Sequence, residues 1–391
     1  MRLKHRSKFF WLLSIAAALI FFQAYMIAPL IPKLSDVFGV PEQQIGFVIP
    51  AYMIAYGISI LFYGVLSDRI GKSRIMLFSL IAFVLLTGLT AFVQSSSQLI
   101  LLRLLTGLGA SGVVPMALAL VGDLYEPHER GKPLGFLFAA MEGGMALGST
   151  AGVMLEPYIG WRMLFLGIAL IAAIILLFQW GSVYKTTPKH EVVKSSVSQM
   201  LSGFYKLLSS GRGLKTYSFV FWNGIFHSGI YTWLGLYFSQ KYELDEFGIG
   251  LAILGYGLPG FLFGSLIGRA ADKWGRFLII VTGLGIAAVA TVLLITDHSV
   301  IIAALAVTAI SLGYDLTQPL FAGIVTEIGG KKQGGQAMGL NVFALFTGFG
   351  IGSLLFGEIL RLGFDAALII FASIQIFATL IAIPIFRKEL K

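Results

Sequence analysis

The chain has 391 residues, of which 57% are apolar and only 12% are charged. Soluble domains carry about 25% charged residues, so this composition excludes a single soluble domain, and its hydrophobicity excludes a disordered chain. Cysteine is absent, which excludes disulfides and thiolate sites, and 28 Lys and Arg against 19 Asp and Glu give a net charge of +9.

Long apolar stretches recur along the chain, and a membrane-spanning helix needs about 20 mostly apolar residues. They exceed the length of barrel strands and so predict helices. The first six are expected at 9–31, 43–66, 75–95, 99–122, 134–157 and 162–184. Six more are expected at 216–240, 247–270, 277–296, 300–325, 336–360 and 366–386. The first stretch has no small-residue cleavage pattern after it, so we expect it to be retained as a helix.

The sequence therefore predicts an all-α integral membrane protein with twelve transmembrane helices. They form two six-helix bundles, 1–184 and 216–391, joined by a polar linker, 185–215. Of the 28 Lys and Arg, 23 fall in the terminal segments and loops on one side and 4 on the other. The positive-inside rule then places both termini and the linker in the cytoplasm, so topology rather than nucleic-acid binding explains the basic excess. Within the linker, 196–209 is expected to form an amphipathic helix on the membrane surface.

The two halves of the chain repeat each other at an offset of 204 residues. Asp68 corresponds to Asp272 and Pro115 to Pro319, and Asp123 meets Glu327. Both six-helix halves start on the same side of the membrane, so the repeat is parallel. This is the plan of secondary transporters in which two halves rock around a central site.

The loop after the second predicted helix carries the clearest motif. It reads Gly64-Val-Leu-Ser-Asp68-Arg69-Ile-Gly71-Lys72, and its repeat reads Gly268-Arg-Ala-Ala-Asp272-Lys273-Trp-Gly275-Arg276. We expect Gly64 and Gly268 to permit close helix approach, and Gly71 and Gly275 to permit the turn.

This duplicated loop resembles the signature of the major facilitator superfamily, and the resemblance covers the whole chain. It implies a transporter rather than an enzyme, and a gating interlock between the loop and an acidic residue that ends helix 4. The residues implied are Asp68, Arg69, Lys72 and Asp123 in the first half and Asp272, Arg276 and Glu327 in the second. The alternative is that these charges only orient the protein in the membrane.

Two further segments resemble motifs of the proton antiporters in this superfamily. Arg103-Leu-Leu-Thr-Gly-Leu-Gly-Ala is similar to the helix 4 motif, with Thr106 in place of Gln, and implies that Arg103 takes part in proton coupling. The alternative is an Arg that reaches the interface. In helix 5 the resemblance rests on glycines, with Ser149 replacing a Pro: Gly135, Gly144, Gly148 and Gly152. Their alternative role is ordinary small-residue packing.

Ionisable residues inside the membrane are candidates for function. Glu142 and Asp315 fall well inside predicted helices and suit a group that exchanges protons, although a neutral hydrogen-bonded contact is the alternative. Glu156 and Glu358, near outer helix ends, are expected to be solvated. The candidate substrate cavity comprises Gln23, Tyr25, Tyr52, Tyr56, Asn223, His227, Tyr231, Gln318 and Asn341. For His227 a purely structural role is the alternative.

No phosphate-binding loop, metal-ligand cluster or catalytic triad is present, so we expect no metal and no cofactor, with the proton gradient as the driving force. The sequence thus predicts a monomeric, proton-coupled exporter of a drug-like or amphipathic small molecule in the inner membrane of a bacterium. A sugar or metabolite symporter, a lipid exporter or flippase, and a non-transporting sensor are the alternatives.

Overall fold

The computed structural model describes residues 2–126, 131–186 and 197–389, and within these ranges it is helical, without strands. The N-terminal half contains α1 (Arg2–Tyr25), α2 (Ile31–Phe38), α3 (Glu42–Gly46), α4 (Val48–Ile70), α5 (Lys72–Thr90), α6 (Ser96–Ala110), α7 (Val113–Leu124) and α8 (Gly131–Thr186). After α9 (Val197–Ser209), the C-terminal half contains α10 (Gly211–Tyr242), α11 (Glu246–Ile253), α12 (Leu258–Trp274), α13 (Arg276–Ile295), α14 (Val300–Ile359) and α15 (Phe364–Phe386).

These helices form an integral membrane bundle. Ten helical stretches among the described residues are long and apolar enough to span a membrane. One of them, in α8, is 48 residues long and consists of two arms that meet at Gly160, where the backbone leaves the helical conformation. The second arm of α8 adds an eleventh span to these ten. The 32-residue helix α10, which is less apolar, adds the twelfth, so the number of spans agrees with the prediction.

Several spans that we expected to be continuous are interrupted. The first consists of α1, a 3-10 turn η1 (Ala28–Leu30) and α2, and it reaches Phe38 rather than residue 31. Pro29 and Pro32 explain this interruption, because proline cannot donate the backbone hydrogen bond that continues a helix. The fourth span breaks between α6 and α7, and the eighth between α11 and α12.

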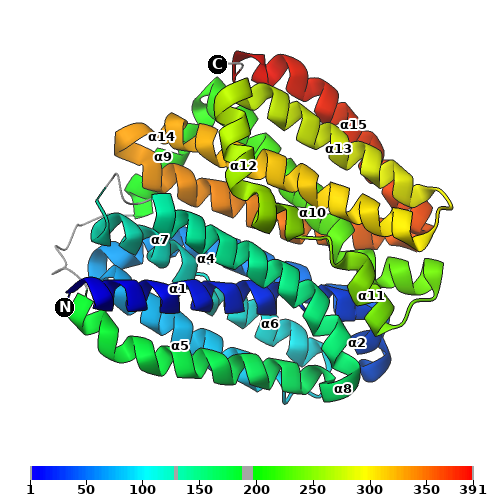
Figure 1. Ribbon diagram of the computed structural model, residues 1–391, viewed down its shortest axis with the longest axis horizontal. Helices are drawn as coiled ribbons and strands as arrows, with labels where there is room; N and C mark the ends of the chain where they lie inside the picture. The colour runs from blue at the N-terminus through cyan, green and yellow to red at the C-terminus, as the bar shows by residue number, and fades with distance from the viewer. Residues whose placement is uncertain (1, 127–130, 187–196, 390–391) are drawn as a thin grey trace.

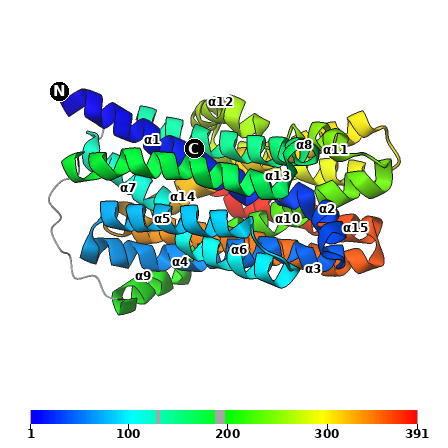
Figure 2. The same ribbon diagram turned by 90° about the horizontal axis from the view of Figure 1, so that it is seen from below.

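The two halves lie against each other along the length of the bundle. Figure 1 shows α1–α8 in its lower part and α10 and α12–α15 in its upper part, with α11 at the right-hand end. In both views α9 and the start of α1 lie toward the left, and α2 and α11 toward the right (Figures 1 and 2). We refer to these as the α9 end and the α11 end. The boundaries of the two predicted units, at 184 and 216, stay a prediction, although α10 already begins at Gly211, after the N-cap Ser210.

The predicted amphipathic helix in the linker exists as α9, but its apolar face packs on protein. Met200, Phe204 and Leu207 are buried against residues of α10 and α14, and Leu61 and Val65 of α4 adjoin this cluster. The opposite face is exposed and includes Leu201 and Tyr205. Helix α9 therefore contacts both halves of the bundle, and part of its exposed surface is apolar.

Candidate functional site

Helix α1 and the first arm of α8 are in backbone contact through glycines. A Cβ atom added at Gly148 would lie only 2.7 Å from Phe22 Cα. Gly144 and Gly152 repeat this contact one turn before and one turn after, whereas a Cβ at Gly135 would have nothing within 4 Å. Only glycine lets two helix backbones come this close. Three of the four predicted helix 5 glycines therefore hold α8 against α1.

The C-terminal half repeats this contact between α10 and the second arm of α14. A Cβ added at Gly352 would lie 2.6 Å from Ile225 Cα, and Gly348 packs one turn earlier. Because both halves use the same glycine contact, small-residue packing is a sufficient explanation of these positions. The antiporter signature in helix 5 remains a resemblance.

Arg103 on α6 points into the bundle and is fully buried. Its guanidinium donates to the Gln23 side-chain oxygen at 2.9 Å and to the Ala24 backbone carbonyl at 3.2 Å. Its Nε donates to the Val48 carbonyl at 3.4 Å. The carbonyls of Gln23 and Ala24 belong to the last turn of α1, where they lack partners within the helix. Arg103 thus caps α1, and the alternative in which it reaches the interface is wrong.

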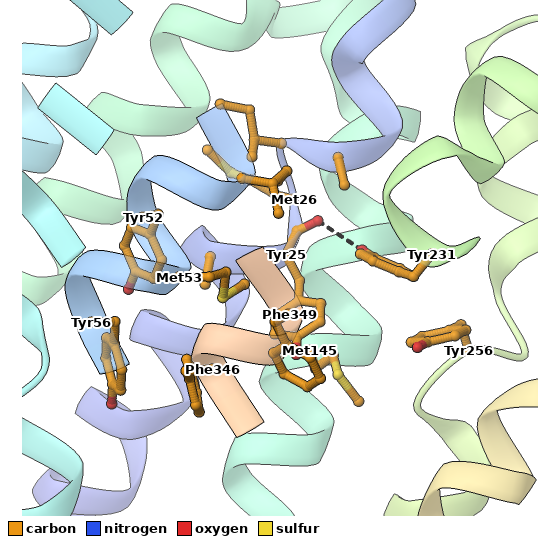
Figure 3. Packing of buried hydrophobic residues seen from close by; sticks show 14 of the residues in the cluster. Tyr25, Met26, Tyr52, Met53, Tyr56, Met145, Tyr231, Tyr256, Phe346 and Phe349 are labelled. Carbon is orange, nitrogen blue, oxygen red and sulfur yellow. Dashed lines mark hydrogen bonds between the residues drawn. The ribbon is translucent and has the colours of Figure 1, made fainter. Parts of the chain in front are cut away.

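The Arg103 charge is followed by a row of stacked rings. Its guanidinium lies 4.1 Å from the centroid of the Tyr52 ring, a cation–π contact. Tyr52 stacks on Tyr56 at 5.9 Å, and Tyr56 stacks on Phe346 of α14 at 4.5 Å (Figure 3). The row leads from the N-terminal half to the C-terminal half. Among the side chains that the structure describes, no carboxylate forms a salt bridge with Arg103.

A second aromatic cluster occupies the centre of the bundle, where both halves meet. The Tyr231 hydroxyl on α10 donates to the Tyr25 carbonyl on α1 at 2.8 Å, and the two rings lie 5.3 Å apart (Figure 3). Tyr256, from the break between α11 and α12, lies 4.5 Å from the Tyr231 ring. A cavity of about 10 Å³ lies beside these rings, between both halves; it is lined by Ala24, Tyr25, Ile49, Met53, Ser228, Tyr231, Tyr256 and Phe349. That is room for about one water molecule.

The two predicted intramembrane carboxylates belong to this central region. Glu142 and Asp315 interact electrostatically with each other, and both also interact with Tyr256 and Tyr314. Asp315 is 4% exposed and accepts hydrogen bonds from the Ser311 hydroxyl and the Gly260 backbone. The Glu142 Oε2 atom is buried and has no hydrogen-bond partner. The structure thus brings together two carboxylates from opposite halves.

The other predicted cavity residues are distributed over several contacts. Asn223 donates to Gln318 at 3.2 Å and accepts from Thr317, so this pair links α10 to α14. His227 is buried, its ring lies edge-on to Tyr314 at 5.2 Å, and neither ring nitrogen has a hydrogen-bond partner. Gln23 belongs to the Arg103 contacts described above.

The side-chain contact described for Asn341 is local to α14. Its amide nitrogen contacts the Met338 sulfur one turn earlier on α14, and its side-chain oxygen has no partner. Its assignment to the substrate cavity is therefore not supported by any contact with the other predicted cavity residues in the described part of the chain.

At the α11 end a lysine joins the two halves. Lys33 of α2 lies 3.7 Å from Glu156 of α8 and 3.6 Å from Glu246 of α11. The Glu156 side chain is only 6% exposed, so the expectation that it is solvated is wrong. Glu358 is exposed, as expected, and pairs with Arg361.

The duplicated loop lies at the α9 end. Gly71 and Gly275 have φ angles of 98° and 82°, so both turns use a backbone conformation that favours glycine, as predicted. Gly64 and Gly268, in contrast, have nothing within 4 Å of a Cβ position. The expectation of a close helix approach at these two glycines is wrong, because no described atom of a neighbouring helix lies within 4 Å of either position.

The structure describes the salt bridges of the duplicated loop only for its copy in the C-terminal half. Arg276 and Glu327, predicted partners, form a salt bridge of 2.6 Å. Two residues that the sequence did not indicate complete a network: Arg212, at the start of α10, pairs with Glu327 at 2.9 Å and with Glu389 at 2.7 Å. The network ties the C-terminal turn η4 (Arg387–Glu389) to the α9 end. The predicted side chains of Asp68, Asp123 and Asp272 lie outside the described residues, and Arg69 and Lys72 have partners of their own.

Sequence reasoning missed Tyr256, Tyr314 and Ser311. Tyr256 stands in the run Gly-Tyr-Gly-Leu-Pro, and a Gly/Pro interruption inside a hydrophobic segment is a known pointer to a transport site. Tyr314 directly precedes Asp315, and Ser311 precedes it by one helical turn, so both lie near a residue that was already a candidate.

Similar proteins of known sequence are bacterial transporters. The MFS-type transporter YceJ of Bacillus subtilis is 28% identical over 275 residues, which cover 70% of this chain and 69% of that protein. The quinolone resistance protein NorA of Staphylococcus aureus is 27% identical over 366 residues, 89% of each chain. Multidrug resistance protein 3 of Bacillus subtilis is 28% identical over 207 residues, 52% of this chain and 40% of that one.

Solved structures share the fold at low sequence identity. The human organic anion transporter MFSD10 superposes with a TM-score of 0.74 at 17% identity, over 96% of this chain and 99% of that one. A D-xylose–proton symporter gives a TM-score of 0.76 at 15% identity, over 95% and 96%. The sequence also matches the family description Major Facilitator Superfamily over residues 13–255 and 216–391. The chain therefore belongs to the major facilitator superfamily and is an integral membrane transporter.

Proposed function

We propose that this transporter exports amphipathic, drug-like small molecules in exchange for protons, by alternating access. The observation that carries the proposal is the Glu142–Asp315 pair, two intramembrane carboxylates from opposite halves that interact with a central cluster of tyrosines. Like charges that interact in a low-dielectric interior disfavour double ionisation, so the pair is suited to taking up and releasing one proton. Proton binding from one side and release to the other would accompany the rocking of the halves.

The surroundings of the pair support a bulky, partly apolar substrate. The rings of Tyr25, Tyr231 and Tyr256 present apolar faces and hydroxyl groups to the small central cavity. Separating the two halves would widen that cavity into a site lined by aromatic faces, which suit flat, hydrophobic or cationic molecules. The names of NorA and multidrug resistance protein 3 agree with a substrate of this kind.

The test measures proton movement that depends on substrate. Purified protein is reconstituted in proteoliposomes with an acidic lumen and a trapped pH-sensitive dye, and ethidium, a permanently charged aromatic cation, is added outside. We expect ethidium to enter while protons leave the lumen. Glu142→Gln and Asp315→Asn should abolish the coupled proton flux, whereas Glu358→Gln, a change at an exposed carboxylate, should leave it intact.

Two results would contradict this function. Ethidium flux that ignores the pH gradient would exclude proton antiport. Proton movement in the same direction as added D-xylose, with no response to ethidium, would instead support a symporter, the activity named for one structural neighbour.

We further propose that the α9 end faces the cytoplasm of a bacterial cell, that the protein is a monomer in the inner membrane, and that only the proton gradient drives it. The distribution of 23 basic residues on one side and 4 on the other supports this orientation. The duplicated loop then acts as a cytoplasmic gate, which the Arg276–Glu327 salt bridge supports in the C-terminal half. Asp68→Asn should greatly reduce transport without loss of membrane insertion, and normal transport by this variant would count against the gate.

A further inference from the structure

The break between α11 and α12 is held by a serine of α14. Gly257, in the break, has a φ angle of 88°, a left-handed conformation that favours glycine. That N–H donates to the Ser311 hydroxyl oxygen at 2.9 Å. Ser311 is 1% exposed, so no bulk solvent can replace this bond.

The same hydroxyl contacts Asp315. The Ser311 Oγ atom lies 3.5 Å from Asp315 Oδ2, one helical turn further along α14, and donates to it. The Gly260 N–H, in the first turn of α12, also donates to this carboxylate, and a Cβ at Gly260 would lie 2.9 Å from Asp315 Cγ. The N-terminus of a helix favours a negative charge. Asp315 therefore receives one side-chain bond, one backbone bond and the dipole of α12.

The first turn of α12 also contacts the N-terminal half beside Glu142. A Cβ at Gly257 would lie 3.2 Å from Ala146 Cα, and Phe261 lies 3.4 Å from the Cβ position of Gly143. Gly143 directly follows Glu142 in α8. A change in the contact between Asp315 and α12 would therefore alter the packing between the two halves, next to the second carboxylate.

We propose that Ser311 is a positioning residue for proton coupling, which holds the Asp315 carboxylate against the first turn of α12 and so favours its ionised form. This inference rests on the proposed function, in which the Glu142–Asp315 pair exchanges the proton. It adds the residue that links this exchange to the broken helix, and Ser311 itself neither titrates nor contacts the other half.

The other groups that face Asp315 do not substitute for this bond. Glu142, from α8, repels the ionised carboxylate, and Tyr256 and Tyr314 interact with it only through space. His227, from α10, contacts the Tyr314 ring. Loss of the Ser311 hydroxyl removes a donor that only the ionised carboxylate fully uses. The proton should consequently be retained to higher pH.

The first test reads the Asp315 proton without any substrate. Infrared spectra of the purified full-length protein are recorded against pH, and the carboxylic acid band that disappears in Asp315→Asn is assigned to Asp315. In Ser311→Ala the midpoint of this band should move up by about one pH unit, a tenfold change in proton binding, or about 1.36 kcal/mol. Ser311→Thr, which keeps the hydroxyl, should restore the midpoint. Ser14→Ala, which removes a buried hydroxyl bonded only to its own helix, should not move it.

The second test repeats the ethidium assay against pH, where the optimum of Ser311→Ala should shift in the same direction as the band. An unchanged midpoint in Ser311→Ala, or a shift of equal size in Ser14→Ala, would overturn the inference. If ethidium is not transported at all but the band shifts as stated, the proposed substrate class fails while the role of Ser311 stands. If Ser311→Ala does not accumulate in the membrane, Ser311→Val is compared with Ser311→Thr. These two side chains have nearly the same shape and differ in the hydroxyl group, so the band midpoint should be higher in Ser311→Val.

Discussion

The contact between α1 and the first arm of α8 makes a sharp prediction about stability. In Gly148→Ala the new Cβ would lie 2.7 Å from Phe22 Cα, whereas carbon atoms pack best at about 3.5–4.0 Å. The opposing atoms are backbone, so no side-chain rotation can relieve the clash, and α1 must move away by roughly 1 Å. Overpacking of this kind costs about 1–3 kcal/mol.

Gly135→Ala is the matched control on the same helix. Nothing lies within 4 Å of its Cβ position, so the substitution should gain the helix propensity of alanine, about 0.8–1 kcal/mol. Gly148→Ala makes the same gain in helix propensity, so only the clash separates the two changes, and Gly135→Ala should be the more stable variant by about 1–3 kcal/mol. The assay is thermal unfolding of the purified protein in detergent, followed by the loss of the monodisperse peak on size-exclusion chromatography.

The result that would refute this reasoning is equal stability of Gly148→Ala and Gly135→Ala. The second half provides a repeat of the experiment, because a Cβ at Gly352 would lie 2.6 Å from Ile225 Cα. Gly352→Ala should lower the unfolding temperature in the same way as Gly148→Ala. Opposite behaviour of the two would show that the glycine contacts of the two halves are not equivalent.

Three further predictions concern charged groups. Arg103→Lys keeps the charge but loses the forked guanidinium that reaches both α1 and α4. In thermal unfolding, each hydrogen bond left unmade should lower the free energy of unfolding by about 1.5–3 kcal/mol. Wild-type stability of this variant would contradict the capping role. Glu327→Gln should cost less than about 1 kcal/mol of unfolding free energy, since its partners are partly exposed, and a larger loss in the same assay would argue for a stronger network. Glu246→Gln removes the salt bridge that Lys33 forms between the halves. Because the chain has no native cysteine, thiol labelling of Gln43→Cys reports on this end, and its rate should rise up to about fivefold. Unchanged labelling would show that this salt bridge does not hold the α11 end closed.

Much of the architecture follows from local properties of the sequence. Hydrophobic stretches of spanning length predict helices because a backbone in lipid must satisfy its own hydrogen bonds. The positive φ angles at Gly71 and Gly275 were predictable. Each glycine lies three residues after its aspartate, Asp68 or Asp272, in the short turn between two helices, and glycine adopts a positive φ angle without steric cost. Charge scarcity singled out Arg103, Glu142 and Asp315, since a charge in the membrane needs a specific partner.

Other features depend on which helices become neighbours, and a single sequence does not contain that information. The solvated position expected for Glu156 was wrong: its side chain is only 6% exposed and lies 3.7 Å from Lys33, which also pairs with Glu246 of the other half. Gly64 and Gly268 were expected to pack against a helix, yet none of the described residues comes within 4 Å of their Cβ positions, whereas a Cβ at Gly148 would meet the α1 backbone. Asn341 shares the polar character of the cavity residues, yet the contact described for it is with Met338 on its own helix.

The sequence by itself determined the membrane fold, the repeat of the two halves and the short list of buried charges, because these follow from composition, period and offset along the chain. Only the tertiary structure decided that Arg103 caps α1 and that the first turn of α12 lies between Asp315 and the segment of α8 that carries Glu142. It also decided that Ser311 joins the break before α12 to Asp315. Each of these contacts joins segments far apart in the chain, and the packing of helices, not local propensity, sets their distance.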